Sequence, residues 1–472
     1  MAERNAERTR FGRDARENAE AVKALFAENT DLTERVVTGA DGAEYLLLFL
    51  DGVVDKEALQ RFVILPLSAS CRGEAPEARH AAADVKLPAS PREAAKALCC
   101  GSALLFSPGG GTQALELRKP QPDTGKESSP ENIVLGPHAR FRNSCRSNIA
   151  LLRDCIRTPD LASAEFALQS GTLTKVAVCY ISGVADGRVV EAVKRRVFSC
   201  ASADVKSVTE FIELFKEDRL SPFPQYVTSE RPDRVTEALL RGCVAVIPDG
   251  SPWAILAPVS FADFLKSPED SHSPWIYTSL IRLLRLVSVA ITIITPALYV
   301  AVMSFHPRML PVKLMLSAAS GRAAVPLPAI AEVVIMETFI ELLREASASM
   351  PSNVGSTISI VGGIVIGEAA ISAGLASPLL VVIIAISAVT SFTIPVYSMV
   401  ISLRTVRFFS LLLASVFGFY GLIMSLIFMA IHMASLKSMG EDYLFPVAPM
   451  RLKRWKRDLV RFPLRWVRGD GR

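Results

Sequence analysis

Charged residues interrupt an otherwise apolar segment at residues 326–346, namely Glu332, Glu337, Glu341, Arg344 and Glu345. Glu337 and Glu341 are four residues apart and therefore share one face of a helix, with Arg344 and Glu345 one turn further along. Ionisable side chains at membrane depth are costly, so they face protein or water. The stripe therefore predicts the lining of an ion pathway or gate. The alternative is that Arg344 pairs with Glu341 and only ties helices together.

A second carboxylate, Glu368, ends a glycine-rich apolar segment that has no basic residue near it. A ring of such carboxylates at a helix axis would favour cations. Gly363 and Gly367 form a GxxxG pair with Gly362 and Gly374 nearby, and small residues let a second helix approach closely. This pattern indicates helix packing first. It concerns function only if the packed neighbour is a partner subunit or another copy of the chain.

Three prolines, Pro296, Pro378 and Pro395, fall within or beside the apolar segments. A proline leaves carbonyl groups without their helical partner, so each marks either an ordinary kink or a mobile hinge. The five histidines and eight cysteines show no metal-ligand spacing, and no nucleophile elbow, Walker or dinucleotide fingerprint occurs. The sequence thus predicts a non-enzymatic protein without metal or cofactor.

The composition separates a soluble region from a membrane region. The chain has 472 residues, of which 50% are hydrophobic and 21% charged. Residues 1–280 carry 34 Lys+Arg against 38 Asp+Glu, residues 281–450 carry 9 against 7, and residues 451–472 carry 9 against 2. The net charge of +5 is therefore confined to the end of the chain. It predicts no nucleic-acid surface but an aromatic-bearing basic tail that lies on an anionic leaflet.

Residues 286–305 contain no charge, and at about 1.5 Å per residue this stretch is long enough to span a bilayer core of about 30 Å. Later apolar runs, at 346–367, 369–403 and 408–436, are interrupted only by Glu368, Arg404 and Arg407. The sequence SAGLASP at 372–378 breaks the second run, so about five membrane helices are expected. Arg282, Arg285 and the basic tail place both ends in the cytoplasm by the positive-inside rule. An even number of crossings follows, and the charged helix at 326–346 is the candidate for a re-entrant element.

The soluble region shows the alternation of strand and helix signals that is typical of α/β domains. Expected strands lie at 45–50, 103–106, 112–117, 174–181, 226–228, 244–248 and 253–258, and expected helices at 55–61, 91–98, 142–156, 186–196, 208–215 and 231–241. The resulting fold class is two small α/β domains, the second with a mixed sheet, followed by an all-α polytopic membrane domain. The expected divisions are a flexible segment at 1–30, α/β subdomains at 31–118 and 132–275, a linker at 119–131, a transmembrane domain at 276–450 and a basic amphipathic tail at 451–472. All cysteines precede residue 280, and free thiols in a reducing cytoplasm are expected.

The string SIVGGIVIGEAAISAGLASPLLVVIIAISAVTSFTIP, residues 359–395, resembles the signature membrane segment of the A-subunit family of bacterial spore germinant receptors, the GerA group, which includes SpoVAF-type paralogues. Further blocks resemble the family in the same order. They are DGVVD (51–55), SNIALL (147–152), SPFPQ (221–225), ERPDR (230–234), DGSP (249–252), SPED (267–270), PALYV (296–300), FHP (305–307), ME (336–337) and LREA (343–346). The resemblance extends from about residue 47 to 449.

The resemblance implies a receptor component in the inner membrane of a bacterial spore, with its N-terminal domains facing the cytoplasm or spore core. Such A subunits act with a transporter-like B subunit and a lipoprotein C subunit, and are thought to form a homo-oligomeric ring that conducts monovalent cations. The chain departs from the family at Glu368, where Gln is common, and at GPHARF (136–141) and NVGS (353–356).

These features suggest that the helix at 359–374 lines or backs a pore whose charge is set by Glu368 and by the face that carries Glu337 and Glu341. Two other functions are compatible with the sequence. One is a secondary transporter that binds its solute at the break at 374–378. The other is a structural scaffold for the B subunit.

Overall fold

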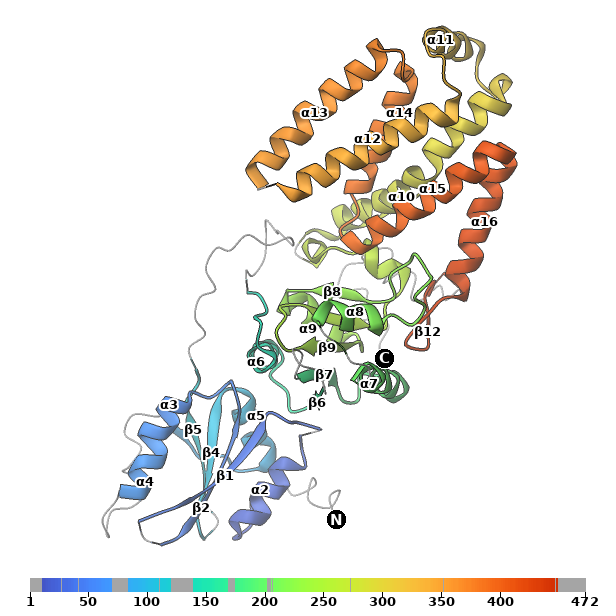
Figure 1. Cartoon of the computed structure of the whole chain (residues 1–472). Helices are drawn as coiled ribbons and strands as arrows, with labels where there is room; N and C mark the ends of the chain where they lie inside the picture. Colours follow the sequence, from blue (N-terminus) through green and yellow to red (C-terminus); the bar gives the residue numbers. More distant parts are fainter. Residues whose placement is uncertain are drawn as a thin grey trace. The chain divides into compact units, whose positions relative to one another are not determined.

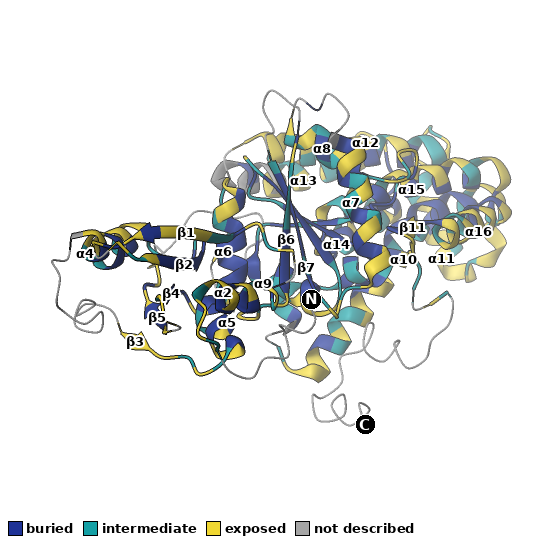
Figure 2. Cartoon of the chain, turned by 90° about the horizontal axis from the view of Figure 1, so that it is seen from below, coloured by how far each residue is buried: buried dark blue, intermediate teal, exposed yellow. Residues whose placement is uncertain are grey.

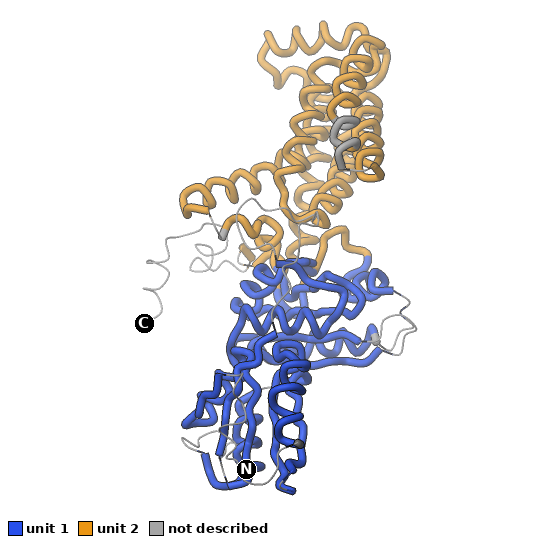
Figure 3. The backbone as a smooth tube through the Cα atoms, turned by 90° about the vertical axis from the view of Figure 1, so that its left-hand side faces the viewer, with its two compact units in different colours: residues 1–219, 226–259, 438–441 blue, residues 220–225, 260–437, 442–472 orange. Residues whose placement is uncertain are grey.

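The computed structural model describes residues 11–26, 28–40, 42–69, 84–109, 111–119, 139–168, 175–201, 205, 207–271, 273–350, 352–445 and 447–448. The chain forms two compact units, coloured separately in Figure 3. Unit 1 comprises residues 1–219, 226–259 and 438–441, and unit 2 comprises 220–225, 260–437 and 442–472. The tail at 451–472 and all of the expected linker except Lys119 lie outside the described residues.

The first half of unit 1 is a five-stranded antiparallel sheet in the order β1-β2-β4-β5-β3 (Figure 1). Its strands are β1 (Leu32–Thr38), β2 (Glu44–Leu50), β3 (Val85–Lys86), β4 (Ser102–Phe106) and β5 (Thr112–Glu116). Six of the seven residues of β2 are buried, because Leu46 and Leu48 face one core and Leu47 and Phe49 face another. A strand that is covered on both sides needs this continuous apolar run.

Helices cover both faces of this sheet. Helices α2 (Ala15–Lys23) and α5 (Pro91–Cys99) pack on the core that contains Leu48. The other core is closed by α3 (Lys56–Leu59), a π-helical turn at Gln60–Ile64 and α4 (Leu65–Ala69). A flexible segment was expected at 1–30, but Ala19 and Val22 of α2 are buried in this core. Most apolar residues of α2 are alanines, which give only a weak apolar signal in the sequence.

The second half of unit 1 repeats this plan with a sheet in the order β6-β7-β9-β10-β8. The strands are β6 (Leu161–Ala167), β7 (Lys175–Ile181), β8 (Val227–Ser229), β9 (Val244–Pro248) and β10 (Ala254–Ala257). The helices are α6 (Cys145–Cys155), α7 (Gly187–Ala201), α8 (Val208–Phe215) and α9 (Pro232–Leu240). Strand β7 is largely buried (Figure 2), whereas β6 is buried only over its first three residues.

Every strand pair in this second sheet is antiparallel, so the mixed sheet expected from the sequence is wrong. Two adjacent pairs, β6–β7 and β9–β10, are consecutive in the chain, and β8 pairs with β10 rather than with β9. The helix α9 connects β8 to β9, which are both antiparallel to β10 and lie on either side of it, so the connected strands are not the neighbouring parallel pair that a mixed sheet would contain.

A buried ion pair joins the two sheets of unit 1. The fully buried Arg153 of α6 donates to both carboxylate oxygens of Asp31, at 2.8 and 3.0 Å. The hydroxyl of Ser163 donates to the same carboxylate at 2.9 Å, and the amide of Thr30 donates to the Ser163 carbonyl. Arg153 and Asp31 are 122 residues apart in the sequence, so only the fold brings them together.

Seven α-helices make up most of the described part of unit 2, whereas the sequence analysis expected about five membrane helices. They are α10 (Trp275–Phe305), α11 (Val312–Arg322), α12 (Ala329–Ser349), α13 (Ser352–Ser372), α14 (Pro378–Phe392), α15 (Tyr397–Phe417) and α16 (Phe419–Ser435). The two additional helices arise because α11 forms in a weakly apolar connection and because the run at 408–436 is interrupted.

The interruption of that run is Gly418, which has φ +60° and separates α15 from α16. A Cβ atom at this glycine would lie 2.9 Å from the ring of Phe305, so the ends of α10 and α15 meet there. The break expected at 372–378 is confirmed. Gly374 has φ +66°, and Ser377 caps α14 by accepting a hydrogen bond from the amide of Leu380 at 3.3 Å.

Two of these helices, α10 and α15, are long and apolar enough to cross a membrane. Three shorter apolar helices are found at Ile360–Ser372, Pro378–Phe392 and Phe419–Ser435. With 31 residues, α10 is about 46 Å long, which exceeds a bilayer core of about 30 Å. Part of α10 therefore extends beyond the length that a membrane core would cover.

Candidate functional site

A central polar network joins four helices of unit 2. Glu337 of α12 pairs with Arg407 of α15 at 2.6 Å, with side chains that are 2% and 3% exposed. Arg407 also donates to the Ser387 hydroxyl of α14 at 3.1 Å. Ser387 in turn donates to the backbone carbonyl of Thr292 in α10 at 3.3 Å. Buried charges are tolerated when they are paired in this way, so the network holds the helices in one arrangement.

Pro296 explains why the carbonyl of Thr292 is available to Ser387. A proline has no amide hydrogen, so the carbonyl four residues before it loses its helical partner. Pro296 lies inside α10, four residues after Thr292, and is buried. The hydroxyl of Ser387 thus replaces the missing backbone donor.

A second cluster lies where α14 ends and α15 begins, and we call Glu341, Arg344 and Arg404 the arginine cluster. Arg344 donates to Glu341 at 3.2 Å, and Arg404 of α15 pairs with the other oxygen of the same carboxylate. The guanidinium of Arg344 lies 5.5 Å from the ring centroid of Phe392, and that of Arg404 lies 6.0 Å from Tyr397. The Arg344–Glu341 pair considered as an alternative in the sequence analysis is therefore present.

Glu332, in the first turn of α12, is fully buried, and its side chain contacts the break between α13 and α14. One of its oxygens accepts from Arg322 of α11 at 3.0 Å, and the other accepts from the backbone amide of Ser377 at 3.2 Å. Tyr299 of α10 donates to Glu332 at 3.5 Å and contacts the Ser377 hydroxyl at 2.9 Å. The carboxylate lies at the N-terminus of α14, where the helix dipole favours a negative charge.

Glu368 lies apart from these clusters, exposed on α13, and forms no ion pair among the described residues. It shares one helix face with Ile360 and Ile364, which are also exposed. Next to this face, a Cβ atom at Gly363 would meet nothing within 4 Å. The outer side of α13 is thus an apolar face that carries one carboxylate.

The other glycines named from the sequence serve contacts within the chain. Gly362 approaches α12, since its Cβ would lie 2.6 Å from Leu343, and that of Gly367 would lie 3.8 Å from Val381 of α14. Gly374 forms the turn before α14. The GxxxG pair therefore has one member that packs inside the chain and one, Gly363, that is open.

Two prolines lie at helix boundaries. Pro378 is the first residue of α14, where its missing amide hydrogen costs nothing. Pro395 lies in the connection between α14 and α15. Whether either acts as a hinge stays a prediction.

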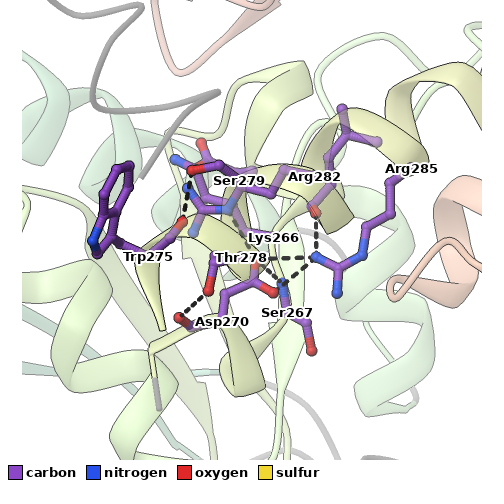
Figure 4. Close-up of polar contacts among 10 residues, drawn as sticks. Lys266, Ser267, Asp270, Trp275, Thr278, Ser279, Arg282 and Arg285 are labelled. Atoms are coloured by element: carbon purple, nitrogen blue, oxygen red, sulfur yellow. Dashed lines mark hydrogen bonds and ion pairs between the residues drawn. The ribbon is translucent and has the colours of Figure 1, made fainter. Parts of the chain in front are cut away.

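The start of α10 is anchored by Asp270, as Figure 4 shows. This buried carboxylate accepts from Arg282 at 2.9 Å and from Arg285 at 3.0 Å, and Thr278 donates to its backbone carbonyl at 3.3 Å. Arg285 also donates to the carbonyl of Leu265 at 2.8 Å. The two arginines that flank the apolar part of α10, and that the positive-inside argument uses, are thus paired within unit 2.

Sequence reasoning identified Glu337, Glu341, Arg344 and the pairing of Glu341 with Arg344, but not the partners that α15 supplies. It assigned no role to Arg404 or Arg407, which had been noted only as interruptions of an apolar run. Their spacing of three residues places both on one face of a helix, as the spacing of four does for Glu337 and Glu341. These two spacings are the signal that could have linked the arginines to the carboxylates. For Glu332 and Asp270, the spacing of nearby residues in the sequence gives no comparable indication of their partners.

Four thiols are buried in unit 1, those of Cys99, Cys145, Cys179 and Cys200. Burial raises the pKa of Cys99 from 9.0 to about 12, and burial raises the pKa of Cys145 to about 12 as well. Cys100 and Cys155 are exposed. All seven cysteines among the described residues are free thiols.

A model of the Bacillus/Clostridium GerA spore germination protein family matches residues 20–470. Spore germination protein GerLA of Bacillus cereus is 39% identical over 333 residues, covering 71% of this chain and 68% of that protein. Spore germination protein B1 of Bacillus subtilis (strain 168) is 33% identical over 463 residues, covering 96% of each chain. Spore germination protein KA of the same strain is 35% identical over 469 residues, covering 95% of this chain and 84% of that protein.

One solved structure is also similar, the crystal structure of the N-terminal domain of the A subunit of the Bacillus megaterium spore germinant receptor GerK3. It is 22% identical in sequence with a TM-score of 0.41, and the match covers 54% of this chain and 98% of that one.

Proposed function

Because this chain belongs to the Bacillus/Clostridium GerA family of spore germination proteins, we propose that it is the A subunit of a germinant receptor that passes monovalent cations through a homo-oligomeric pore. In this proposal the chain is not an enzyme. It acts with a transporter-like B subunit and a lipoprotein C subunit in the inner membrane of the spore, with unit 1 on the cytoplasmic or core side. The two membrane-length helices and the three shorter apolar ones support a membrane location.

The observation that carries the proposal is the exposed face of α13. Contact with lipid is favourable for the side chains of Ile360 and Ile364 but unfavourable for the carboxylate of Glu368 on the same face. A carboxylate at bilayer depth faces protein or water, so another copy of the chain or an aqueous axis must cover this face. The open side of Gly363 leaves room for a close helix neighbour.

In this proposal the charge of the pore comes from Glu368 and not from the face of α12. Glu337 and Glu341 are neutralised by Arg407, Arg404 and Arg344, so they offer little charge to a passing cation. We assign them to a gate, because their ion pairs hold α12 against α15 and would have to rearrange if these helices moved apart.

Cation flux through the reconstituted full-length chain tests the proposal. We expect potassium efflux from liposomes, and we expect Glu368→Gln to lower the preference for cations over anions. Glu345→Gln is the matched control, because Glu345 is also an exposed glutamate but lies on α12. Unchanged selectivity in the Glu368→Gln protein would remove this residue from the pore.

The same preparation distinguishes the other two functions. Absence of conductance from every preparation would favour a scaffold. Solute-dependent uptake by the chain alone would favour a transporter. At the break at 374–378, the amide of Ser377 is already bonded to Glu332, so this site shows no free donor of the kind a transported solute would use.

A further inference from the structure

The arginine cluster has more positive charge and more hydrogen-bond donors than its protein partners satisfy. Two guanidinium groups, of Arg344 and Arg404, share the single carboxylate of Glu341. Glu337 is engaged by Arg407, and the exposed Glu345 makes no ion pair among the described residues. The cluster therefore keeps about one unneutralised positive charge.

Three nitrogen atoms of this cluster have no acceptor in the described part of the chain. They are Nη2 of Arg344 and both Nε and Nη2 of Arg404. A buried donor without an acceptor costs about 1–3 kcal/mol, and more when it is charged. An acceptor that the isolated chain lacks would therefore be strongly favoured here.

The position of the cluster indicates what that acceptor is. Phe392 is the last residue of α14 and Tyr397 the first of α15, and their side chains are 70% and 66% exposed. Arg344 and Arg404 hold their guanidinium groups over these two rings. Exposed aromatic side chains at the ends of apolar helices, beside arginines, are typical of the level at which lipid headgroups lie.

The cluster also opens outward. The side chain of Glu341 is 43% exposed, whereas those of Arg344 and Arg404 are largely covered. A ligand can thus approach beside Glu341 and compete with it for the two guanidinium groups. Because arginine matches phosphate oxygens with paired donors, a phosphodiester suits this arrangement.

We propose that the arginine cluster is a binding site for the phosphodiester headgroup of an anionic membrane lipid. The phosphate accepts from Arg344 and Arg404, and Phe392 and Tyr397 contact the lipid around it. Glu341 occupies the donors when no lipid is bound. A bound lipid would therefore replace Glu341 as the partner of Arg404 and weaken an ion pair that joins α12 to α15.

Binding of phosphatidylglycerol to the full-length chain in a neutral detergent tests this site, with bound lipid counted by native mass spectrometry. We expect Arg404→Gln to weaken the affinity for phosphatidylglycerol roughly tenfold, the loss of a charge-assisted contact. Arg308→Gln is the matched control. Arg308 is also an arginine, but it is exposed, follows the C-terminal end of α10 and is not part of the arginine cluster. The comparison is made between variants because the basic residues at 451–472 also attract anionic lipid.

A variant with the opposite expected effect guards against loss of folding. Glu341→Gln removes the competing carboxylate, so it should raise the affinity for phosphatidylglycerol. Equal affinities of Arg404→Gln and Arg308→Gln, or a lower affinity of Glu341→Gln, would overturn the proposal. Phosphatidylcholine should not compete. If inorganic phosphate or glycerol phosphate displaced the lipid at similar concentrations, the site would be one for free anions and the lipid assignment would be wrong.

Discussion

At the scale of single residues, the ionisable side chains of unit 2 act mainly through their partners. Glu337 and Arg407 are almost completely buried, and each neutralises the other. Such a pair adds little net stability compared with apolar residues, but removing one member leaves an uncompensated buried charge. Replacing one member of the pair should therefore destabilise the fold far more than replacing both.

We expect Glu337→Gln to lower the free energy of unfolding by about 3–5 kcal/mol, because Arg407 then lacks a carboxylate. Thermal unfolding of the full-length chain in detergent measures this effect. The double variant Glu337→Gln/Arg407→Gln should lose less than the sum of the two single changes. Glu345→Gln, at an exposed position, should stay within about 0.5 kcal/mol of the parent. Similar losses for Glu337→Gln and Glu345→Gln would contradict the burial described here.

At the scale of elements, glycines decide where helices end and where they can approach one another. Gly374 has φ +66°, and its Cβ would lie 2.7 Å from the carbonyl oxygen of Ala324. Gly363 has helical geometry with nothing within 4 Å of its Cβ. The two residues are close in sequence, but only Gly363 has room for a larger side chain.

Gly374→Ala should therefore destabilise the chain by about 1–3 kcal/mol, through a strained backbone and a close contact. Gly363→Ala is the paired control and should be neutral or stabilising by up to about 1 kcal/mol, because alanine favours helix. Both are measured by thermal unfolding in detergent. If α13 packs against another copy at Gly363, the Gly363→Ala protein should also dissociate more readily in chemical cross-linking. A destabilised Gly363→Ala monomer would disagree with the open space seen there.

At the scale of the whole molecule, stability depends on pH through the core of unit 1. The thiols of Cys99 and Cys145, whose pKa values are raised to about 12 by burial, stay protonated in the folded chain above pH 9.0. In the unfolded chain they lose their protons above that pH. The folded state then binds more protons, so the free energy of unfolding falls as pH rises between about 9 and 12.

Each of these thiols should contribute a decline of up to about 1.4 kcal/mol per pH unit in that window. Urea unfolding of unit 1 within the full-length chain, followed by pulse proteolysis at about pH 8 and about pH 10, measures it. Cys99→Ala should flatten the dependence, and Cys100→Ser, at an exposed thiol, should leave it unchanged. A parent and a Cys99→Ala protein with the same pH dependence would argue against a buried thiol. Maleimide should label Cys100 before Cys99.

Much of the architecture is local and was therefore predictable. The expected strands at 244–248 and 253–258 correspond to β9 and β10, and the helix at 208–215 coincides with α8. The break at 372–378 was also foreseen. In each case the period of apolar residues or a turn residue acts on its immediate neighbours in the chain.

The edge strands β1 and β6 were missed, because their sequences alternate weakly and they become strands only by pairing with β2 and β7. The break at Gly418 was missed because a glycine in an apolar run breaks a helix only when its surroundings require it.

The sequence by itself thus determined which segments are apolar, which are α/β and which carboxylates lie among apolar residues. Only the tertiary structure decided which charge meets which. Arg404 lies 63 residues from Glu341, and Arg153 lies 122 residues from Asp31. Local preferences depend on neighbours along the chain, whereas the partner of a buried charge depends on how distant elements pack. That packing leaves Glu368 exposed and neutralises Glu337.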